Sequence, residues 1–394
     1  MVRLRLLLSL TQRARTIVLI AACLIGLTVA LAGAGRDMDN RLRELRYEYL
    51  QKQPSGQVVI VTIDTPSIKA LGAWPWPRGR HGQMVRALDQ AGAERIVFDI
   101  VFDQPAANPQ QDRLFAQALA ATKAQVYLPA LLENLSNGEE THQSMPTEAL
   151  LPYVTPISTW VKGDPDQVHR RAKMRVPVLG NLLPGMGQVL AHTDYKDDHD
   201  FLIDWSYGPG SFTSIAYSDV LAGRYPKGFF QGKTVLIGAD SFAMGDKYNV
   251  PFYHLISGLY IQAVASETLR AGRPVELGSG PALLAAFLVI AAVLLLKRPR
   301  LRFVGFGMAL AGFVVLQMTL EHKTPFRFDI GPASLAIVTA LLAQALLSVG
   351  QAMLDRITKS AEAGLPNMAA MELQEKDEGV TIVVSLRNYV ETTA

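Results

Sequence analysis

The chain has almost no cysteine, because its 394 residues include only Cys23. An intrachain disulfide is therefore excluded, and any folded domain must be stabilised by its hydrophobic core. A strong charge of one sign is also missing. The formal net charge is only +3, and lysine and arginine gather beside apolar segments instead of along one helix face. We therefore expect no nucleic-acid partner.

Motifs that would bind a metal or a nucleotide are missing as well. Residues 238–247 hold two glycines followed by Asp246 and Lys247, but their spacing differs from that of a phosphate-binding loop and the hydroxyl after the lysine is absent. Residues 192–200 are rich in His and Asp, yet the spacing matches no known metal cage, so a solvated acidic loop is the better interpretation. We expect no cofactor, no metal and no catalytic activity within these residues.

Charge is absent from four long apolar runs, which cover residues 16–35, 277–296, 303–320 and 330–354. Each is long enough for a membrane-spanning helix, which needs about 20 residues. The loop 297–302 carries four cations and no acid, so the positive-inside rule places it in the cytoplasm.

Both termini, 1–15 and 355–394, are then cytoplasmic, and residues 36–276 form an external domain. The arginines just after the first run oppose this orientation. A cleaved signal peptide at residues 16–35 is an alternative, because "ALAGAG" offers small residues at a plausible cleavage site.

The external region is organised around residues 58–104. An apolar run at 58–64 and a second one ending at Asp103 flank a turn-rich piece with a helical pattern, as in a strand, a crossover helix and a parallel strand. Consecutive apolar residues indicate strands that are covered on both faces. Further strands at 125–132 and 233–238, with helices at 214–221 and 259–269, predict an α/β fold with a mainly parallel sheet. Residues 133–200 are expected to be irregular, with short strands.

Candidate site residues follow from this sheet. Asp99 interrupts an apolar run, so it needs a partner, and Arg78 and His81 are the nearest ones. With Trp74 as a cap of the core, His81 and Asp99 are predicted to be structural. Ligands favour the carboxyl ends of parallel strands, and the polar residues expected there are Asp64, Trp76, Arg78, Asp103, Asp246 and Lys247. For Arg78 a purely structural pair with Asp99 remains the alternative.

The charged segment 36–53 contains one apolar helical stripe, made of Met38, Leu42, Leu45 and Tyr49. The stripe could pair between two copies as a stalk, which would make the protein a homodimer, or it could pack against the external domain.

Several separated blocks resemble a known family. The segments "VVIVTIDTPSIKALGAWPWPRGRHGQMVRAL", "AERIVFDIVFDQP", "GKTVLIGADSFAMGDKYNVPF" and "GLYIQAVASETLRAG" are similar to the type-2 CHASE domain. This resemblance implies a periplasmic sensor in the inner membrane of a bacterium. It would detect a small molecule or an envelope component and signal to a cytoplasmic domain or partner.

The tail, residues 355–394, resembles the beginning of a GGDEF domain through "GLPN" at 364–367 and the apolar run 380–384. Ser385 and Arg387 stand where that family has acids, so the copy is degenerate. The resemblance implies an output linked to cyclic di-GMP. Either the chain is a fragment of a longer receptor, or it is a short form with a vestigial output.

Two other functions remain open. One is an exported hydrolase that uses Asp64 and Asp103 as an acid and base pair. The other is a transporter or scaffold built on the spans, which the lack of charge in the four runs disfavours.

Overall fold

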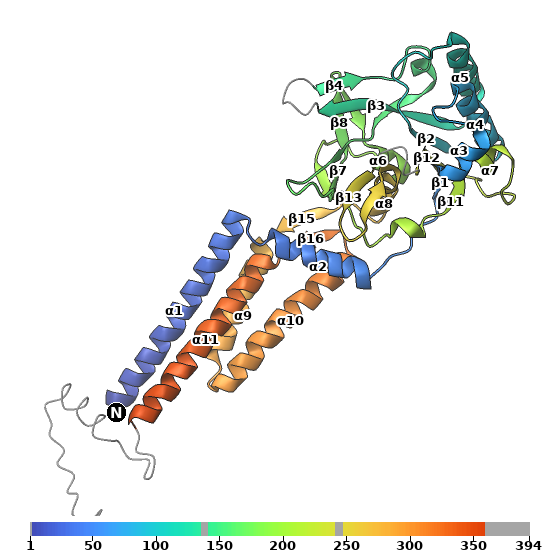
Figure 1. Cartoon of the computed structure of the whole chain (residues 1–394). Helices are drawn as coiled ribbons and strands as arrows, with labels where there is room; N and C mark the ends of the chain where they lie inside the picture. Colours follow the sequence, from blue (N-terminus) through green and yellow to red (C-terminus); the bar gives the residue numbers. More distant parts are fainter. Residues whose placement is uncertain (1, 135–140, 241–246, 359–394) are drawn as a thin grey trace, which may run out of the picture. The chain divides into compact units, whose positions relative to one another are not determined.

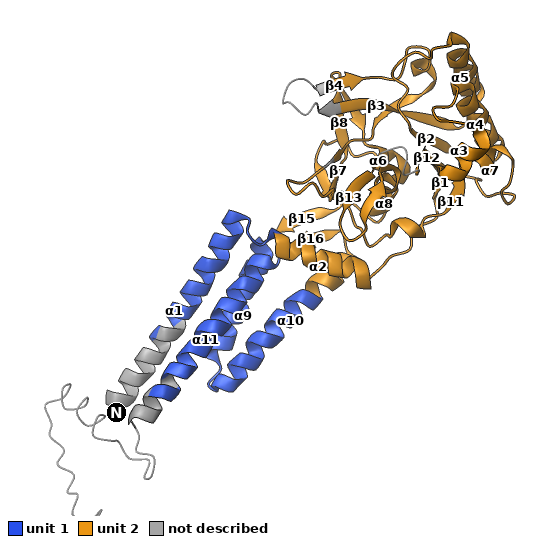
Figure 2. Cartoon of the chain, in the orientation of Figure 1, with its two compact units in different colours: residues 1–36, 279–315, 329–394 blue, residues 37–278, 316–328 orange. Residues whose placement is uncertain are grey.

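A computed structural model describes residues 2–134, 141–240 and 247–358 (Figure 1). The chain divides into two compact units, which Figure 2 shows in blue and orange. Unit 1 comprises residues 1–36, 279–315 and 329–394, and unit 2 comprises residues 37–278 and 316–328. Unit 2 is therefore discontinuous in sequence.

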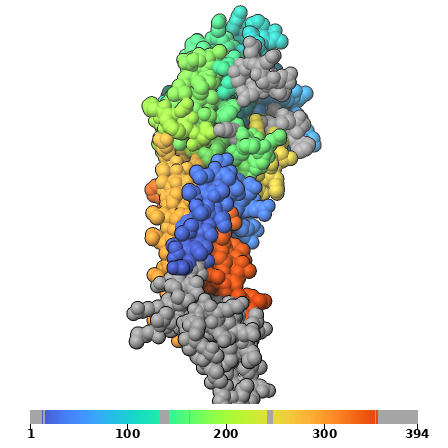
Figure 3. All heavy atoms as spheres, turned by 90° about the vertical axis from the view of Figure 1, so that its left-hand side faces the viewer, coloured from blue at the N-terminus to red at the C-terminus, as the bar shows by residue number. Residues whose placement is uncertain are grey.

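Unit 1 is built from helices. It contains α1 (Val2–Ala32), α9 (Gly280–Leu295), most of α10 (Pro299–Lys323) and α11 (Gly331–Thr358). Helix α1 packs against α9 and α11, and Figure 3 shows its blue atoms between orange and red ones. The approach is close at Gly26, where an added Cβ would lie 3.0 Å from the Cβ of Ala336. A small residue at this position therefore lets the two helices come together.

By length and hydropathy, two described helices could cross a membrane, Pro299–Lys323 and Gly331–Gly350. A third qualifies if Thr16–Ala32 and α2 (Arg36–Tyr49) are counted as one broken span. Helix α9 is apolar but has only 16 residues. The four predicted spans are thus not all found, because Leu277 at the start of the second run belongs to strand β15 (Val275–Gly278).

Unit 2 is organised around a seven-stranded sheet with the order β11-β1-β12-β2-β3-β4, in which β5 also pairs with β3. The pairings are parallel except that of β3 with β4, which confirms the predicted parallel-rich α/β fold. The strands are β1 (Val58–Ile63), β2 (Arg95–Asp99), β3 (Gln125–Asn134), β4 (Thr141–Ser144), β5 (Thr155–Ser158), β11 (Ser214–Ala216) and β12 (Thr234–Ala239).

Helices cover both faces of the sheet, as the consecutive apolar residues of β1 predict. Val59 and Val61 belong to a core on the side of α4 and α5, whereas Val58 and Ile60 belong to a core on the side of α8. The first side carries α3 (Thr65–Leu71), α4 (Arg78–Gln90), α5 (Pro109–Ala121) and α7 (Tyr217–Leu221). The second carries α6 (Met186–Ala191) and α8 (Gly258–Arg270).

Short strands fill the region between β5 and β11. They are β6 (Val161–Lys162), β7 (Arg171–Lys173), β8 (Arg175–Val178), β9 (Asn181–Pro184) and β10 (Asp200–Leu202), and 3-10 turns lie at Leu151–Tyr153 and Pro209–Ser211. The helix predicted at 214–221 is wrong in its first half. Residues 214–216 instead form β11, because they pair with β1 at the edge of the sheet.

Two small ribbons complete unit 2. Strands β13 (Lys247–Val250) and β14 (His254–Ser257) form an antiparallel hairpin directly before α8. Strand β15 pairs in parallel with β16 (Phe326–Phe328), which lies between α10 and α11 in the sequence. The connection between these two apolar helices is thus folded into unit 2.

Candidate functional site

Two aspartates meet at the carboxyl ends of the central strands. The last residues of β1 and β12, Ile63 and Ala239, are register partners, so Asp64 and Asp240 follow at the same edge of the sheet. The backbone N–H of Asp240 donates to the carbonyl of Ile63 at 3.1 Å. Asp64 also caps α3, because its Oδ1 accepts a hydrogen bond of 2.8 Å from the N–H of Ser67.

Asp240 lies at the centre of a polar group that we call the edge cluster, made of Asp64, Asp240, Lys247, Ser257 and Tyr260. The carboxylate of Asp240 accepts hydrogen bonds from Ser257 Oγ at 2.6 Å and from Tyr260 Oη at 3.1 Å. Lys247 Nζ donates to Ser257 Oγ at 2.7 Å and lies 3.6 Å from Asp240 Oδ1. Burial, together with the carboxylates of Asp240 and Asp64, raises the pKa of Tyr260, so its hydroxyl stays a donor.

The edge cluster contains two of the six predicted ligand residues, Asp64 and Lys247. Asp246 lies outside the described residues. Both charged groups of the Lys247 and Asp240 pair keep contact with solvent, since their side chains are 22% and 28% exposed. The cluster can therefore offer a polar ligand a cation, a carboxylate and a hydroxyl, and this role remains a prediction.

The other three predicted residues have different partners. Arg78 forms an ion pair with Asp112 and donates to the carbonyl of Gln104. Asp103 accepts a hydrogen bond of 2.9 Å from Ser144 Oγ. Trp76 is buried, and its indole N–H donates to the carbonyl of Gly72 at 2.8 Å. Each of these contacts is internal, and a ligand role for these residues also remains a prediction.

The predicted pairing of Arg78 with Asp99 is wrong. The guanidinium lies at the first turn of α4 and binds Asp112 in the first turn of α5, because α4 and α5 pack together. Asp99, at the end of β2, is half-buried and lies opposite Gly238 of β12. An added Cβ at Gly238 would lie 3.1 Å from the Cβ of Asp99, so the glycine leaves room for this side chain.

His81 is part of the core on the α4 side. Its ring is buried among aromatic rings that include Trp74, Trp76 and Phe102, and its Nδ1 lies 3.1 Å from the hydroxyl of Tyr217. Burial, with the nearby cations Arg78 and Arg80, lowers the pKa of His81 to about 3. The imidazole is therefore neutral at physiological pH.

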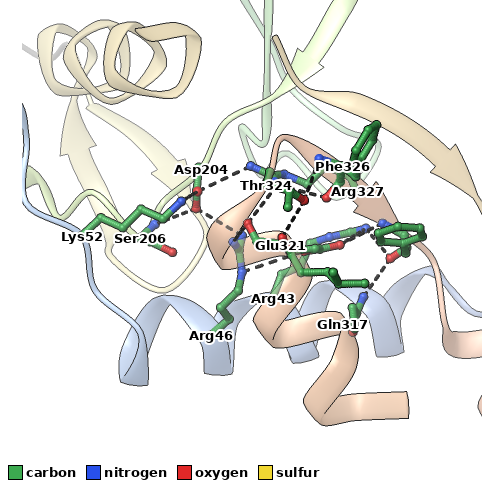
Figure 4. A network of polar contacts seen from close by, with 12 residues as sticks. Arg43, Arg46, Lys52, Asp204, Ser206, Gln317, Glu321, Thr324, Phe326 and Arg327 are labelled. Carbon is green, nitrogen blue, oxygen red and sulfur yellow. Dashed lines mark hydrogen bonds and ion pairs between the residues drawn. The ribbon is translucent and has the colours of Figure 1, made fainter. Parts of the chain in front are cut away.

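A second polar group of unit 2 is the ionic network of Arg43, Arg46, Lys52, Asp204, Glu321 and Arg327 (Figure 4). Three cations surround Asp204, which lies two residues after the end of β10. Arg46 Nη2 lies 3.2 Å from its Oδ1, while Lys52 Nζ at 2.8 Å and Arg327 Nη2 at 3.5 Å approach its Oδ2.

Glu321 is the second carboxylate of the ionic network. Arg43 Nη2 and Arg46 Nε lie 3.5 Å and 3.8 Å from its oxygens, and its Oε1 accepts the N–H of Phe328 at 3.0 Å. The backbone takes part as well. Arg46 donates to the carbonyl of Glu321 at 2.9 Å, and Arg43 to that of Phe328 at 3.1 Å. Helix α2 and residues 321–328 are thus tied together by buried charge.

The electrostatics of the ionic network keep both signs of charge ionised. Burial alone would raise the pKa of the Asp204 carboxyl, but Arg46, Lys52 and Arg327 lower it below its ordinary value. Burial would likewise lower the pKa of Arg46, and the carboxylates of Asp204 and Glu321 raise it instead. Removing one partner of such a buried group leaves an uncompensated charge.

The network was not predicted from the sequence, although one signal for it was present. Asp204 interrupts the apolar stretch Phe201–Trp205, which is the same feature that singles out Asp99. Its partners could not be found in this way, because Arg46 and Arg327 lie far from it in the chain.

Helix α8 extends from the edge cluster to the ionic network. Ser257 precedes its first residue and Tyr260 lies in its first turn, whereas Thr268 near its end accepts the N–H of Asp204 at 2.9 Å. Glu267 beside it accepts the N–H and the hydroxyl of Ser55 at 3.0 Å and 2.7 Å. Nearly all residues between are buried, so α8 is a packed element with a polar contact at each end.

Among the described residues, no group of three or more His, Cys, Asp or Glu side chains could hold a metal ion. The His and Asp residues of 192–200 do not converge on one point, although His199 Nδ1 lies 3.0 Å from Asp197 Oδ1. Asp194 pairs with Arg175 at 2.7 Å, Asp197 with Arg273 at 2.9 Å, and His192 Nε2 lies 2.7 Å from Thr234 Oγ1.

Comparison with protein families shows that the model of the CHASE2 domain matches residues 17–296. Comparisons with curated proteins and with solved structures gave no match. The matched range includes the sheet, the edge cluster and Asp204. Glu321 and Arg327 of the ionic network lie beyond it.

Proposed function

The chain belongs to the CHASE2 domain family of extracellular sensory domains, and from this premise we propose that it is a multi-pass receptor of the bacterial inner membrane. Unit 2 would detect a small molecule or an envelope component in the periplasm. The signal would pass through the apolar helices to a cytoplasmic output. Two helices long and apolar enough to cross a bilayer support the membrane placement.

The proposed topology has four spans and cytoplasmic termini. The loop 297–302, with its four cations, supports a cytoplasmic position between the second and third spans. Helix α9 is the shortest of the four, since 16 residues extend over about 24 Å at 1.5 Å per residue. Local thinning of the bilayer or inclusion of Leu296 would allow it to span.

Reporter fusions test this topology. A fusion after Leu354 is expected to report a cytoplasmic position, and one after Gly56 an external position. A periplasmic signal after Leu354 together with a cytoplasmic one after Gly56 would contradict the orientation.

The edge cluster is the proposed ligand site. A ligand can shift a receptor only if it binds two of its states with different affinity. A polar ligand that replaced the contacts of Asp240 with Ser257 and Tyr260 would act directly on the first turn of α8. The carboxyl edge of a parallel sheet is also where α/β proteins usually bind ligands.

The observation that carries the relay is the position of α8 between the edge cluster and the ionic network. Asp204 is bonded to Thr268 at the end of α8, and its carboxylate holds Arg46 and Arg327. Arg46 belongs to α2, which follows α1 along the chain, and Arg327 belongs to the segment between α10 and α11. A shift of α8 would therefore reach the chain segments that continue into three apolar helices.

Hydrogen exchange on the full chain in lipid nanodiscs tests this relay. Asp240→Asn weakens the contacts with Lys247 and Ser257, so faster amide exchange is expected at the start of α8 and in α2. Asp103→Asn is the matched control, because Asp103 contacts Ser144 and no residue of α8. Faster exchange near Asp240 without any change in α2 would contradict the relay.

The proposed output is a cytoplasmic domain or partner linked to cyclic di-GMP. It is supported by the resemblance of residues 364–367 and 380–389 to the start of a GGDEF domain, and residues 359–394 lie outside the described residues. An exported hydrolase is disfavoured, because Asp64 and Asp103 bind separate partners, Ser67 and Ser144. No observation favours a transporter.

A further inference from the structure

Helix α2 buries several of its charged residues and leaves part of its apolar stripe exposed. Asp39, Arg43 and Arg46 are buried, together with Tyr47. In the stripe predicted from the sequence, Leu45 is 43% and Tyr49 is 72% exposed. Met38 and Leu42 of the same stripe are half-buried, so the expected packing against the domain does not extend to Leu45 and Tyr49.

The ribbon of β15 and β16 shows the same arrangement. Val275 and Phe326 are register partners and are 39% and 43% exposed. Leu277 lies where the register of the two strands shifts at a bulge, and it is 41% exposed. Arg327, next to Phe326, points the other way and is buried in the ionic network.

These two apolar surfaces belong to one end of unit 2. Arg43 and Arg46 hold α2 against residues 321–328, which include β16. The inner face of α2 contacts Asp204 of the domain body, so the face with Leu45 and Tyr49 is directed away from that body. Both surfaces carry an aromatic residue, as expected for side chains at a membrane interface.

The same end of unit 2 is continuous with the apolar helices. Helix α2 begins four residues after α1 ends, α10 ends three residues before Phe326, and α11 begins three residues after Phe328. A chain advances at most about 3.6 Å per residue, so each junction lies within roughly 15 Å of the end of an apolar helix. The exposed residues Arg36, Arg41 and Lys323 add cations beside it that suit lipid phosphates.

We propose that Leu45, Tyr49, Val275, Leu277 and Phe326 form a collar that lies in the interfacial region of the outer leaflet. This inference rests on the proposed placement of α10 and α11 in the membrane. The bilayer is favoured over a second copy because α2 and β16, which carry collar residues, are joined to three apolar helices by short chain segments, with cations beside the junctions. The ionic network fixes one face of α2, and the collar residues then contact lipid. Unit 2 would thus contact the membrane through the collar as well as through the segments that connect it to the apolar helices.

Spin labelling of the full chain in vesicles of phosphatidylethanolamine and phosphatidylglycerol tests the collar. Cys23→Ser removes the native thiol, and single labels are then placed through Leu45→Cys, Phe326→Cys, Arg113→Cys and Met308→Cys. Arg113 is the control, because it is an exposed charged residue of α5, a helix that carries no collar residue. Met308, an exposed residue of α10, reports whether the apolar helix itself lies in lipid.

The collar predicts that labels at Leu45 and Phe326 collide severalfold more often with oxygen than with a water-soluble nickel chelate. At Arg113 the ratio is reversed, and at Met308 oxygen is favoured most. If Leu45 favours the nickel chelate while Met308 favours oxygen, the collar is refuted and the membrane placement stands. Shielding of Leu45 from both reagents, with dipolar broadening, would refute it in favour of a second copy. Nickel access at Met308 would refute the placement itself.

Discussion

Two regions of unit 2 bury titratable groups, and the buried group is neutral in one region and charged in the other. His81 is enclosed by aromatic rings, and burial lowers its pKa to about 3, so it stays neutral. Asp204 is equally buried, but Arg46, Lys52 and Arg327 surround it and lower its pKa, so it stays charged. Burial alone removes charge, and burial with counter-charges retains it.

The core around His81 stabilises the fold, whereas the ionic network connects separate segments of unit 2. The core around His81 gains free energy simply by removing apolar surface from water. The ionic network gains little net free energy, because desolvation of its charges offsets most of their attraction. Its effect is positional, since each charge is stable only when α2, Asp204 and residues 321–328 are together.

The largest effect on stability is expected when the carboxylate of Asp204, at the centre of the ionic network, is removed. Asp204→Ala leaves the buried Arg46 and Arg327 and the half-buried Lys52 without their shared carboxylate, so we expect the free energy of unfolding to fall by about 3–5 kcal/mol. Chemical denaturation of the full chain in micelles, followed by tryptophan fluorescence, measures this loss.

The matched control is Asp166→Ala, which removes a partly exposed partner of Arg170 and should cost less than about 1 kcal/mol. Equal losses in the two variants would mean that Asp204 is hydrated and that the network is not buried.

The second test uses pH to distinguish the two regions. The unfolded chain protonates His81 near its ordinary pKa of about 6.5, and the folded chain does so only near 3. Between these values the unfolded state binds more protons, so stability falls as the pH falls, by about 1.4 kcal/mol per pH unit. Asp204 adds a loss only below its ordinary pKa of about 4, because its folded pKa is lowered.

His81→Phe isolates the first contribution. Phenylalanine suits the aromatic surroundings, and Tyr217 Oη keeps its contact with the carbonyl of Arg80 at 3.4 Å. We expect the variant to lose the contribution of His81 to the slope between pH 6.5 and 4.5 when its denaturation midpoints are compared with those of the parent chain. An unchanged slope would show that His81 is not a buried neutral group.

The smallest expected effect concerns a carboxylate that is neither enclosed by rings nor surrounded by cations. Asp64 caps α3 through the N–H of Ser67, so Asp64→Ala should lower the free energy of unfolding by about 1 kcal/mol. Asp64→Ser keeps a capping oxygen and should recover most of the loss. A loss above about 3 kcal/mol would indicate that Asp64 is a stronger part of the edge cluster than its contacts show.

Much of the fold could be predicted from local sequence. The apolar runs at 58–64, 125–132 and 233–238 become β1, β3 and β12, because strands covered on both faces need consecutive apolar residues. The order of the strands could not be predicted. Strand β12 lies between β1 and β2, and the apolar pattern of each strand says nothing about its neighbours.

The candidate site was predicted less completely. Asp64 and Lys247 were placed at the correct edge of the sheet, but Asp240 and Tyr260 were missed, although Asp240 directly follows a predicted strand. The apolar stripe of α2 was identified from the sequence, but not which face of the helix packs against the domain. That face is decided by Asp204 and Glu321, which are distant in sequence and carry no local sign of pairing with α2.

The pairing of β16 with β15 affects how the sensory domain can be isolated. A soluble fragment that ends at Gly278 would lack Glu321, Arg327 and a strand, and so would leave the guanidinium groups of α2 without one of their carboxylates. A faithful fragment must splice residues 316–328 back onto the end of the domain through a designed linker. The same splice would be needed in any chimaera that grafts this domain onto the helices of another receptor.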